Sequence, residues 1–370
     1  MQFKKWTGSL LLVLMVFATG AQVTGGQYAF QFLTLSDAPH VSALGNVCVA
    51  NTDEDIAFAL QNPSLMRPAM HNELQLNYNS YYAGIGIMNL QYGYHVPEIN
   101  TSFILGIQYI NYGNFTQTDY SGNEYGTFQA REYAISLGAS RSYGQHWRYG
   151  ADIKIASSSL YTNTNAVGLL TDVGINYFDT SSLWDFGATA KNMGLMINAY
   201  TPAVGREPMP FDLQLGAAKQ FAHIPLRIII TLHHFYEWDI AYNNPADVTN
   251  NALGGAQDTA AKAASFGDKL FRHFIFGAEL TLAKKLTLTA SYNVMRRQEL
   301  KLTDMPASAG FAFGLGLDLN KIKVHYARSY YSIAGAYNEF SITMSLNKMM
   351  GIGKAGDKLH WNARYPDSMN

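Results

Sequence analysis

The sequence predicts an all-β protein, a transmembrane β-barrel of about fourteen antiparallel strands with an N-terminal plug segment. Three observations lead to this prediction. Apolar and polar residues alternate with a period of two from residue 70 onward, short and long connections alternate between the strands, and the chain begins with an export signal.

The export signal covers residues 1–21. Lys4 and Lys5 precede an apolar run from Leu10 to Ala18, and the small residues of 19–21 follow it. An uncleaved membrane anchor is the alternative, but the run has about half of the roughly 20 residues that a spanning helix needs. We therefore expect a signal peptide that is removed on export.

Residues 22–69 lack the strand period. They mix small, apolar and polar residues, and they include the acidic run Asp53-Glu54-Asp55 and the sequence Asn62-Pro63. We interpret this stretch as a plug segment that lies inside the barrel.

Residues 70–348 are predicted to form the barrel, and the polar tail 349–370 is expected to lie in the periplasm. Phe311, Phe313 and Leu315, for example, alternate with Ala312 and Gly314. One face of such a strand suits lipid, and a sheet in lipid must close to satisfy its backbone hydrogen bonds. The predicted strands are 70–81, 83–95, 101–113, 126–142, 146–160, 165–178, 183–198, 210–221, 225–240, 269–282, 285–299, 307–319, 321–331 and 336–347.

The connections predict the orientation of the barrel. Most joins from an even-numbered to an odd-numbered strand are tight, as at 143–145 and 283–284, whereas many odd-to-even joins are long: 114–125, 199–209, 241–268 and 300–306. Outer-membrane barrels have short periplasmic turns and long outer loops. The long joins are therefore expected to face outside, and the alternative of a soluble β-sandwich does not explain this order.

Composition and motifs argue against several function classes. A net charge of −1 disfavours nucleic-acid binding, and a single cysteine, Cys48, excludes an internal disulfide framework. No Ser/His/Asp or Cys/His set stands out, so we expect neither an enzyme nor a cofactor. We also expect no metal site, because His233 and His234 would point to opposite faces of a strand.

Charged and glycine residues on the inner face have a structural interpretation. Gly84-x-Gly86 and Gly314-x-Gly316 are placed inside strands, where glycine leaves room for a neighbouring backbone or for the plug. Arg296-Arg297, at an expected outer strand end, could contact lipopolysaccharide or form an ordinary interfacial pair. The charged residues expected to face inward have mixed signs, which favours a lumen paired with the plug over an ion-selective pore; they are Asp152, Lys154, Asp172, Lys191, Arg227, Glu279, Asp318 and Lys323.

Several segments together resemble the PorQ-type outer-membrane barrels of the type IX secretion system. These segments are GGQYAFQFL at 25–33, SALG at 42–45, FALQNPSL at 58–65, LNY at 76–78, YAGI at 82–85, GIQYINYG at 106–113, AKNMG at 190–194, PMPF at 208–211, RHFIFG at 272–277, YNVMRRQE at 292–299 and FSIT at 340–343. The Ala-Leu-Gly and Asn-Pro elements are shared with the related PorV and fatty-acid-transporter-like barrels, whereas the later elements point to the PorQ type.

This resemblance implies an outer-membrane location in a Bacteroidetes-type Gram-negative bacterium. It further implies a role in the attachment complex, which contains a PorU-like sortase, a PorV-like barrel and a PorZ-like surface protein and attaches exported cargo to lipopolysaccharide. The barrel would hold the PorZ-like protein at the surface and would not be the catalyst. A passive transporter of hydrophobic small molecules is the alternative, and it would need an apolar lumen pocket near the plug and a lateral gap in the wall.

The long outer loops are where we expect a partner to bind, because lipid covers the wall of a barrel. Tyrosine and arginine are frequent among interface hot spots. The predicted partner-binding residues are Tyr200, Arg206, Tyr242, Asn243 and Pro245.

Overall fold

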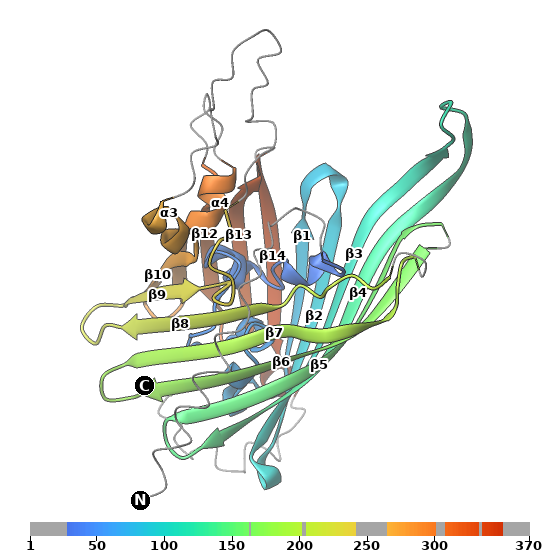
Figure 1. The fold of residues 1–370 in the computed structure, drawn as a ribbon. Helices are drawn as coiled ribbons and strands as arrows, with labels where there is room; N and C mark the ends of the chain where they lie inside the picture. The colour runs from blue at the N-terminus through green and yellow to red at the C-terminus, as the bar shows by residue number, and fades with distance from the viewer. Residues whose placement is uncertain are drawn as a thin grey trace, which may run out of the picture.

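A closed sheet forms the wall of the molecule (Figure 1). The computed structural model describes residues 28–162, 164–201, 205–241, 265–300, 308–332 and 335–350. Fourteen strands lie within these ranges, each antiparallel to its neighbours in chain order. Strand β14 pairs with β1 to close the ring, from Glu73 opposite Ser345 to Ser80 opposite Asn338. The predicted fold class is confirmed, while the predicted signal peptide and all but the first two residues of the tail lie outside the described residues.

The strands and helices have the following bounds. The strands are β1 Glu73–Ser80, β2 Gly86–Val96, β3 Thr101–Thr118, β4 Glu124–Tyr143, β5 Trp147–Tyr161, β6 Thr164–Asp179, β7 Trp184–Asn198, β8 Asp212–Gln220, β9 Leu226–Leu232, β10 Phe274–Leu282, β11 Leu286–Asn293, β12 Phe311–Asp318, β13 Ile322–Ser332 and β14 Gly335–Ser345. The α-helices are α2 Pro39–Ala43, α3 Phe266–Arg272, α4 Val294–Glu299 and α5 Leu346–Met350; the 3-10 helices are η1 Gln31–Thr34, η2 Ile56–Leu60, η3 Pro63–Leu65, η4 Pro68–Met70, η5 Tyr82–Gly84 and η6 Pro97–Ile99.

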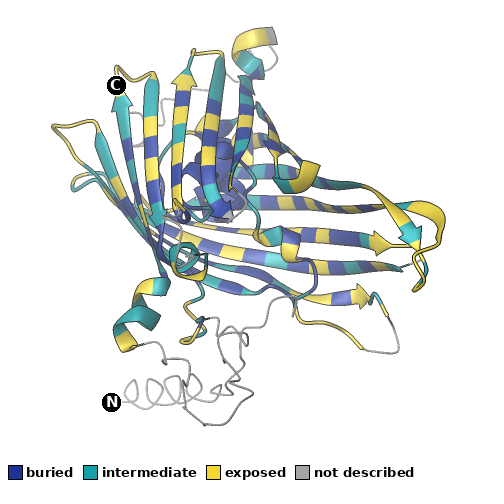
Figure 2. Ribbon diagram, turned by 90° about the horizontal axis from the view of Figure 1, so that it is seen from above, coloured by how far each residue is buried: buried dark blue, intermediate teal, exposed yellow. Residues whose placement is uncertain are grey.

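Along each strand, buried and exposed residues alternate (Figure 2). In β4, Leu137 is 61% exposed on the outside, while its neighbours Ser136 and Gly138 face inward and are buried. An apolar outer face and a small or polar inner face are typical of a membrane barrel, because the outside meets hydrocarbon. Within the described part of the chain, no helix is long and apolar enough to cross a membrane.

The wall has very different heights around the barrel (Figure 1). Strand β4 has 20 residues and β9 has 7, which correspond to roughly 66 Å and 23 Å at about 3.3 Å per residue. The tall side is made by β3 to β7. We call the end where odd-numbered strands finish and even-numbered strands begin the outer end, after the predicted topology. The prediction that 114–125 forms a loop is largely wrong, because β3 continues to Thr118 and β4 begins at Glu124.

Three predicted strands are too long at the outer end. Strand β9 stops at Leu232. Helix α3 precedes β10 and helix α4 follows β11, so each of these two strands is shorter than predicted. Asn293 caps α4 by accepting a hydrogen bond from the backbone N–H of Arg296 (3.1 Å), and Ser265 caps α3 in the same way. The predicted placement of Arg296-Arg297 on a strand is therefore wrong. The outer joins after β5 and β13 are also short, so loop length alternates only in part.

Residues 28–72 lie inside the barrel, and we call them the inner segment (Figure 2). They run as short helices α2 and η1 to η4 against inward-facing glycines of the wall. A Cβ added at Gly187 would lie 1.9 Å from the carbonyl oxygen of Val49, and one at Gly314 would lie 2.5 Å from Ala43 Cβ. These glycines allow the backbones to approach, as predicted for Gly314. The predicted placement of Gly84 inside a strand is wrong, because it lies in the turn before β2, with φ 78°.

Candidate functional site

A buried ion-pair network ties the inner segment to the short side of the wall. His40 of α2 contacts Asp55 Oδ2 through Nδ1 (2.8 Å) and Glu279 Oε1 of β10 through Nε2 (2.7 Å). Arg227 of β9 donates to Glu279 Oε2 (2.9 Å) and to Asp53 Oδ1 (2.7 Å). We call His40, Asp53, Asp55, Arg227 and Glu279 the clamp. Each wall residue of the clamp contacts the inner segment, so the network holds this segment to β9 and β10.

Local structure fixes the ends of the clamp. Pro39 starts α2, which carries His40, while Asp55 caps η2 by accepting the backbone N–H of Ala57 (3.0 Å). Burial alone would lower the pKa of His40, but hydrogen bonds and charges from Asp55 and Glu279 outweigh it and raise the pKa to about 10. For Asp55, burial alone would raise the pKa. The nearby His325, His40 and Lys323 outweigh this effect, so the pKa of Asp55 is lowered. His40 is thus an imidazolium between two carboxylates.

Other inward charges hold the same segment. Lys191 donates to the carbonyl oxygen of Leu60 (3.1 Å), and Lys323 donates to the carbonyl oxygen of Glu54 and to Glu73 Oε1 (3.1 Å). Lys154 pairs with Asp172 within the wall. Of the eight charged residues expected inside, Asp318 differs, because its carboxylate accepts the backbone N–H of Asn320 in a turn. Four of the eight, Lys191, Arg227, Glu279 and Lys323, therefore contact the inner segment.

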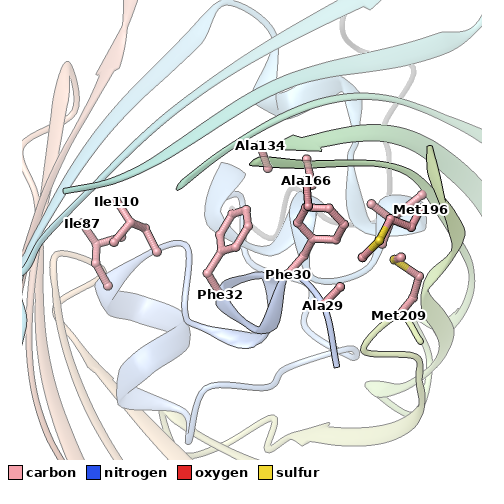
Figure 3. Close-up of a cluster of buried hydrophobic side chains, with 11 residues drawn as sticks. Ala29, Phe30, Phe32, Ile87, Ile110, Ala134, Ala166, Met196 and Met209 are labelled. Atoms are coloured by element: carbon pink, nitrogen blue, oxygen red, sulfur yellow. The ribbon is translucent and has the colours of Figure 1, made fainter. Parts of the chain in front are cut away.

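An apolar cluster fills the lumen on the tall side (Figure 3). Phe30 and Phe32 of the inner segment are 1% and 3% exposed, and they pack among small and aliphatic wall residues such as Ala134 and Ala166. A Cβ at Gly168 would lie 2.6 Å from the Phe30 ring, so this glycine makes room for it. The space that an apolar substrate would occupy at this level is taken by the protein's own side chains.

A cavity of about 390 Å³ opens at the outer mouth beside this cluster. It lies where the wall steps down: β7 continues to Asn198, but β8 pairs with it only as far as Lys191 opposite Asp212. The lining mixes apolar residues such as Leu33, Val47 and Ile240 with charged ones, namely Lys191, Asp212, Arg296 and Glu299. Burial raises the pKa of Glu299 despite Arg296 nearby. Apolar walls with a few charged groups are typical of small-molecule sites.

At this cavity the expectation for His233 and His234 is wrong. Both follow the end of β9, and His234 has a left-handed backbone with φ 54°. This conformation turns its ring back, so that the two Nδ1 atoms lie 2.6 Å apart, with Asp212 Oδ2 3.9 Å from the Nδ1 of His234. The argument from opposite strand faces fails because it assumed that the strand continues to residue 240.

Three groups of side chains in the described residues bring three metal-binding atoms together. Two of them share His40, whose ring nitrogens both contact carboxylates of the clamp and leave no lone pair for a metal while His40 is protonated. The third group is Asp212, His233 and His234 at the mouth cavity.

Of the predicted partner-binding residues, the structure describes Tyr200 and Arg206. Tyr200 packs against the apolar cluster, with its ring centroid 6.4 Å from that of Phe30. Arg206 is exposed in the stretch that leads to β8. Tyr242, Asn243 and Pro245 lie outside the described residues.

An exposed aromatic surface, which sequence reasoning missed, lies at the outer end of the tall side. We define the aromatic hairpin as the tip of β3–β4 together with Tyr161 of β5. Phe115 stacks on Phe128 with centroids 5.4 Å apart, and Phe128 meets Tyr161 at 5.0 Å. Tyr120 and Tyr125 at the tip are fully and 59% exposed. Aromatic residues within the predicted loop 114–125 were the available signal, since Phe115, Tyr120 and Tyr125 follow one another at five-residue intervals.

Comparisons with known proteins give structural similarities only. No protein-family model and no curated protein sequence matches the chain. Among solved structures, the toluene transporter TbuX of Ralstonia pickettii aligns with a TM-score of 0.49 at 11% identity, covering 85% of this chain and 98% of that one. The toluene transporter TodX of P. putida aligns with a TM-score of 0.46 at 14% identity, covering 84% of this chain and 96% of that one. A FadL homologue of Pseudomonas aeruginosa aligns with a TM-score of 0.43 at 9% identity, covering 83% of this chain and 98% of that one.

Proposed function

We propose that this chain is a non-enzymatic barrel of a Gram-negative, Bacteroidetes-type outer membrane that anchors a surface protein at its outer rim. The sequence resemblance to PorQ-type barrels supports a place in the attachment complex of the type IX secretion system. The anchored partner would be a PorZ-like protein, so that the complex with the PorU-like sortase and the PorV-like barrel can process cargo and attach it to lipopolysaccharide.

The filled lumen is the observation that carries this proposal. The clamp holds the inner segment on one side, and Phe30 and Phe32 occupy the lumen on the other. A lumen occupied in this way supports a function at a surface of the barrel. Lipid covers the wall, which leaves the rim for binding a soluble partner.

The aromatic hairpin is the rim surface best suited to a protein partner. It combines large exposed rings with the rigid pairing of two long strands, from Asn114 opposite Gln129 to Thr118 opposite Glu124. Rigid aromatic side chains lose little conformational entropy on binding and dominate many interfaces. The exposed Arg206 adds a charged group on the same end of the barrel.

A non-catalytic role agrees with the use of the buried polar groups. His40, Asp55 and Glu279 are engaged with one another, and Cys48 is fully buried in the inner segment, where burial raises the pKa of its thiol. A thiol of this kind is a poor nucleophile. We propose no reaction at these groups.

The experiment is co-purification from the native membrane. The tagged full chain is extracted in mild detergent, and surface proteins that accompany it are identified and quantified for the wild type, for Tyr120→Ala combined with Tyr125→Ala, and for Tyr143→Ala as matched control. Tyr143 is 73% exposed at the opposite end of β4. The partner should accompany the wild type and the control and should be released to the medium by the hairpin variant. Equal retention in all three proteins refutes the hairpin as the anchor.

Passive transport of a hydrophobic small molecule is the second candidate, because the mouth cavity lies at the step between β7 and β8. Such a route would have to pass charged groups at the mouth and the filled apolar cluster. Uptake of a labelled aromatic hydrocarbon by proteoliposomes tests it. Uptake well above that of empty vesicles would favour transport over anchoring.

A further inference from the structure

We propose that Asp212, His233 and His234 bind a divalent metal ion of the zinc type at the outer mouth of the barrel. Two imidazoles and one carboxylate form a donor set that zinc accepts in sites that keep an open coordination position. The proposal rests on the arrangement of these side chains, on the groups that orient them and on access from outside.

The distances between the three donor atoms suit one metal after a small adjustment. The two Nδ1 atoms lie 2.6 Å apart, and Asp212 Oδ2 lies 3.9 Å from the Nδ1 of His234. Two donors on a tetrahedral zinc, at about 2.0–2.1 Å each, are about 3.3 Å apart. The first distance would open by about 0.7 Å and the second would close by about 0.6 Å, which ring rotation at the partly exposed His234 can supply.

Neighbouring groups already orient the ligands. Asp212 Oδ1 accepts the backbone N–H of His234 (2.6 Å), and its Oδ2 accepts from Gln214 Nε2 (2.7 Å). His233 is fixed through its backbone, since its N–H donates to the carbonyl oxygen of His273 (3.0 Å) and its own carbonyl oxygen contacts His273 Nδ1 (2.9 Å). Outer hydrogen bonds of this kind hold metal ligands in place.

The chain leaves the hydrogen bonding of this cluster incomplete. His233 is 2% exposed, and its Nε2 atom has no hydrogen-bond partner among the described residues. One proton is shared between the two Nδ1 atoms. If His233 carries it, Nε2 of His233 is a buried acceptor without a partner; if His234 carries it, Nε2 of His233 is protonated and is a buried donor without a partner. Coordination of a metal by both Nδ1 atoms would replace their close mutual contact, and Nε2 of His233 would then carry the proton.

The site is open to solvent at the mouth of the barrel. The side chain of His234 is 35% exposed, and all three ligands line the mouth cavity, which also contains the carboxylates of Glu237 and Glu299. With Asp212, these carboxylates outnumber the basic Lys191 and Arg296 of the same lining by three to two, which favours a cation, and the open coordination position would face the cavity. The metal would join the start of β8 to the end of β9 at the lowest part of the rim.

Metal binding by the purified full chain in detergent tests the proposal. The affinity tag is removed and the protein is treated with a chelator before metal is added. Co²⁺ serves as the spectroscopic probe and Zn²⁺ as its competitor. The wild type should bind one Co²⁺ per chain with the absorption of a four- or five-coordinate site. His234→Ala and Asp212→Asn should weaken binding at least about tenfold, and Gln214→Ala by about 10- to 100-fold. His223→Ala, at an exposed turn, is the matched control and should bind like the wild type.

Folding of each variant is checked by heat-modifiable migration on gels. Asp212→Asn keeps the shape of the side chain, so it decides the question if His234→Ala does not fold. Absence of stoichiometric binding by the folded wild type would overturn the proposal. Equal affinity of the wild type and the folded ligand variants would also overturn it, because the metal would then be held elsewhere.

Discussion

Replacement of His40 by glutamine should remove the main pH dependence of the stability of this barrel. Glutamine can still donate one hydrogen bond to a carboxylate, but it cannot carry the charge that Asp55 and Glu279 share in the wild type. Removing one member of a buried ion pair costs about 3–5 kcal/mol, because the remaining charges stay buried. The variant should therefore unfold at lower denaturant concentration than the wild type at pH 6.

The magnitude follows from the pKa of His40, which is raised from 6.5 to about 10 in the folded protein. A group whose pKa is raised by folding stabilises the protein fully below its unfolded pKa and loses this effect as the pH rises through the folded pKa. Each pKa unit corresponds to about 1.4 kcal/mol. The wild type should lose about 4 kcal/mol of unfolding free energy from this group between about pH 6 and pH 10.

The assay is urea unfolding of the full chain in detergent at several pH values in this range, followed by tryptophan fluorescence. The wild type should show the additional loss of stability, whereas His40→Gln should show a flatter pH dependence. His223→Gln, at an exposed turn, serves as control and should follow the wild type. Parallel pH profiles of the wild type and His40→Gln would refute the shared imidazolium.

Four further predictions concern the barrel and its inner segment. Gly187→Val should destabilise the protein by about 1–3 kcal/mol or more in urea unfolding, because its Cβ would lie 1.9 Å from a carbonyl oxygen of the inner segment; Gly267→Ala, with open space around its Cβ, should be neutral. Planar-bilayer recording should show only small conductance, and a large steady pore would contradict a plug function of the inner segment. Cysteines placed at Gly144 and Asn250 should be labelled in intact cells only at residue 250, and the reverse pattern would refute the topology. Replacing 245–265 by a short Gly-Ser link should leave the barrel heat-modifiable and release the surface partner, so normal partner retention would exclude this loop as a contact.

The strands were predictable because lipid and lumen impose one pattern on every strand. Phe311, Phe313 and Leu315 face outward and are exposed, while Ala312 is buried, as their alternation indicates. Such a pattern depends only on neighbouring residues. The number of strands and their order could therefore be inferred without any tertiary contact.

Strand ends were less predictable, because local capping competes with the alternating pattern. Residues 294–299 continue a strand-like sequence, yet Asn293 caps a helix there. The same limitation explains the error at His233 and His234. A single left-handed residue, His234, ends the alternation and brings the two rings together.

The clamp was beyond prediction because it is made by distant residues. His40 and Glu279 are separated by 239 positions, and nothing in the residues around His40 indicates an inward carboxylate on β10. The charges on the inner strand faces could be predicted, and so could a pairing with the N-terminal segment in general terms. Which groups meet depends on the path of the inner segment, which has no periodic pattern.

The most direct test of the central claim is quantitative purification of the full chain from its native outer membrane. A closed barrel that acts as an anchor should come with a surface protein in a fixed ratio, and that protein should be lost when Tyr120 and Tyr125 are replaced by alanine. Recovery of the intact chain alone from mild detergent, without any stoichiometric surface protein, would contradict the anchoring function.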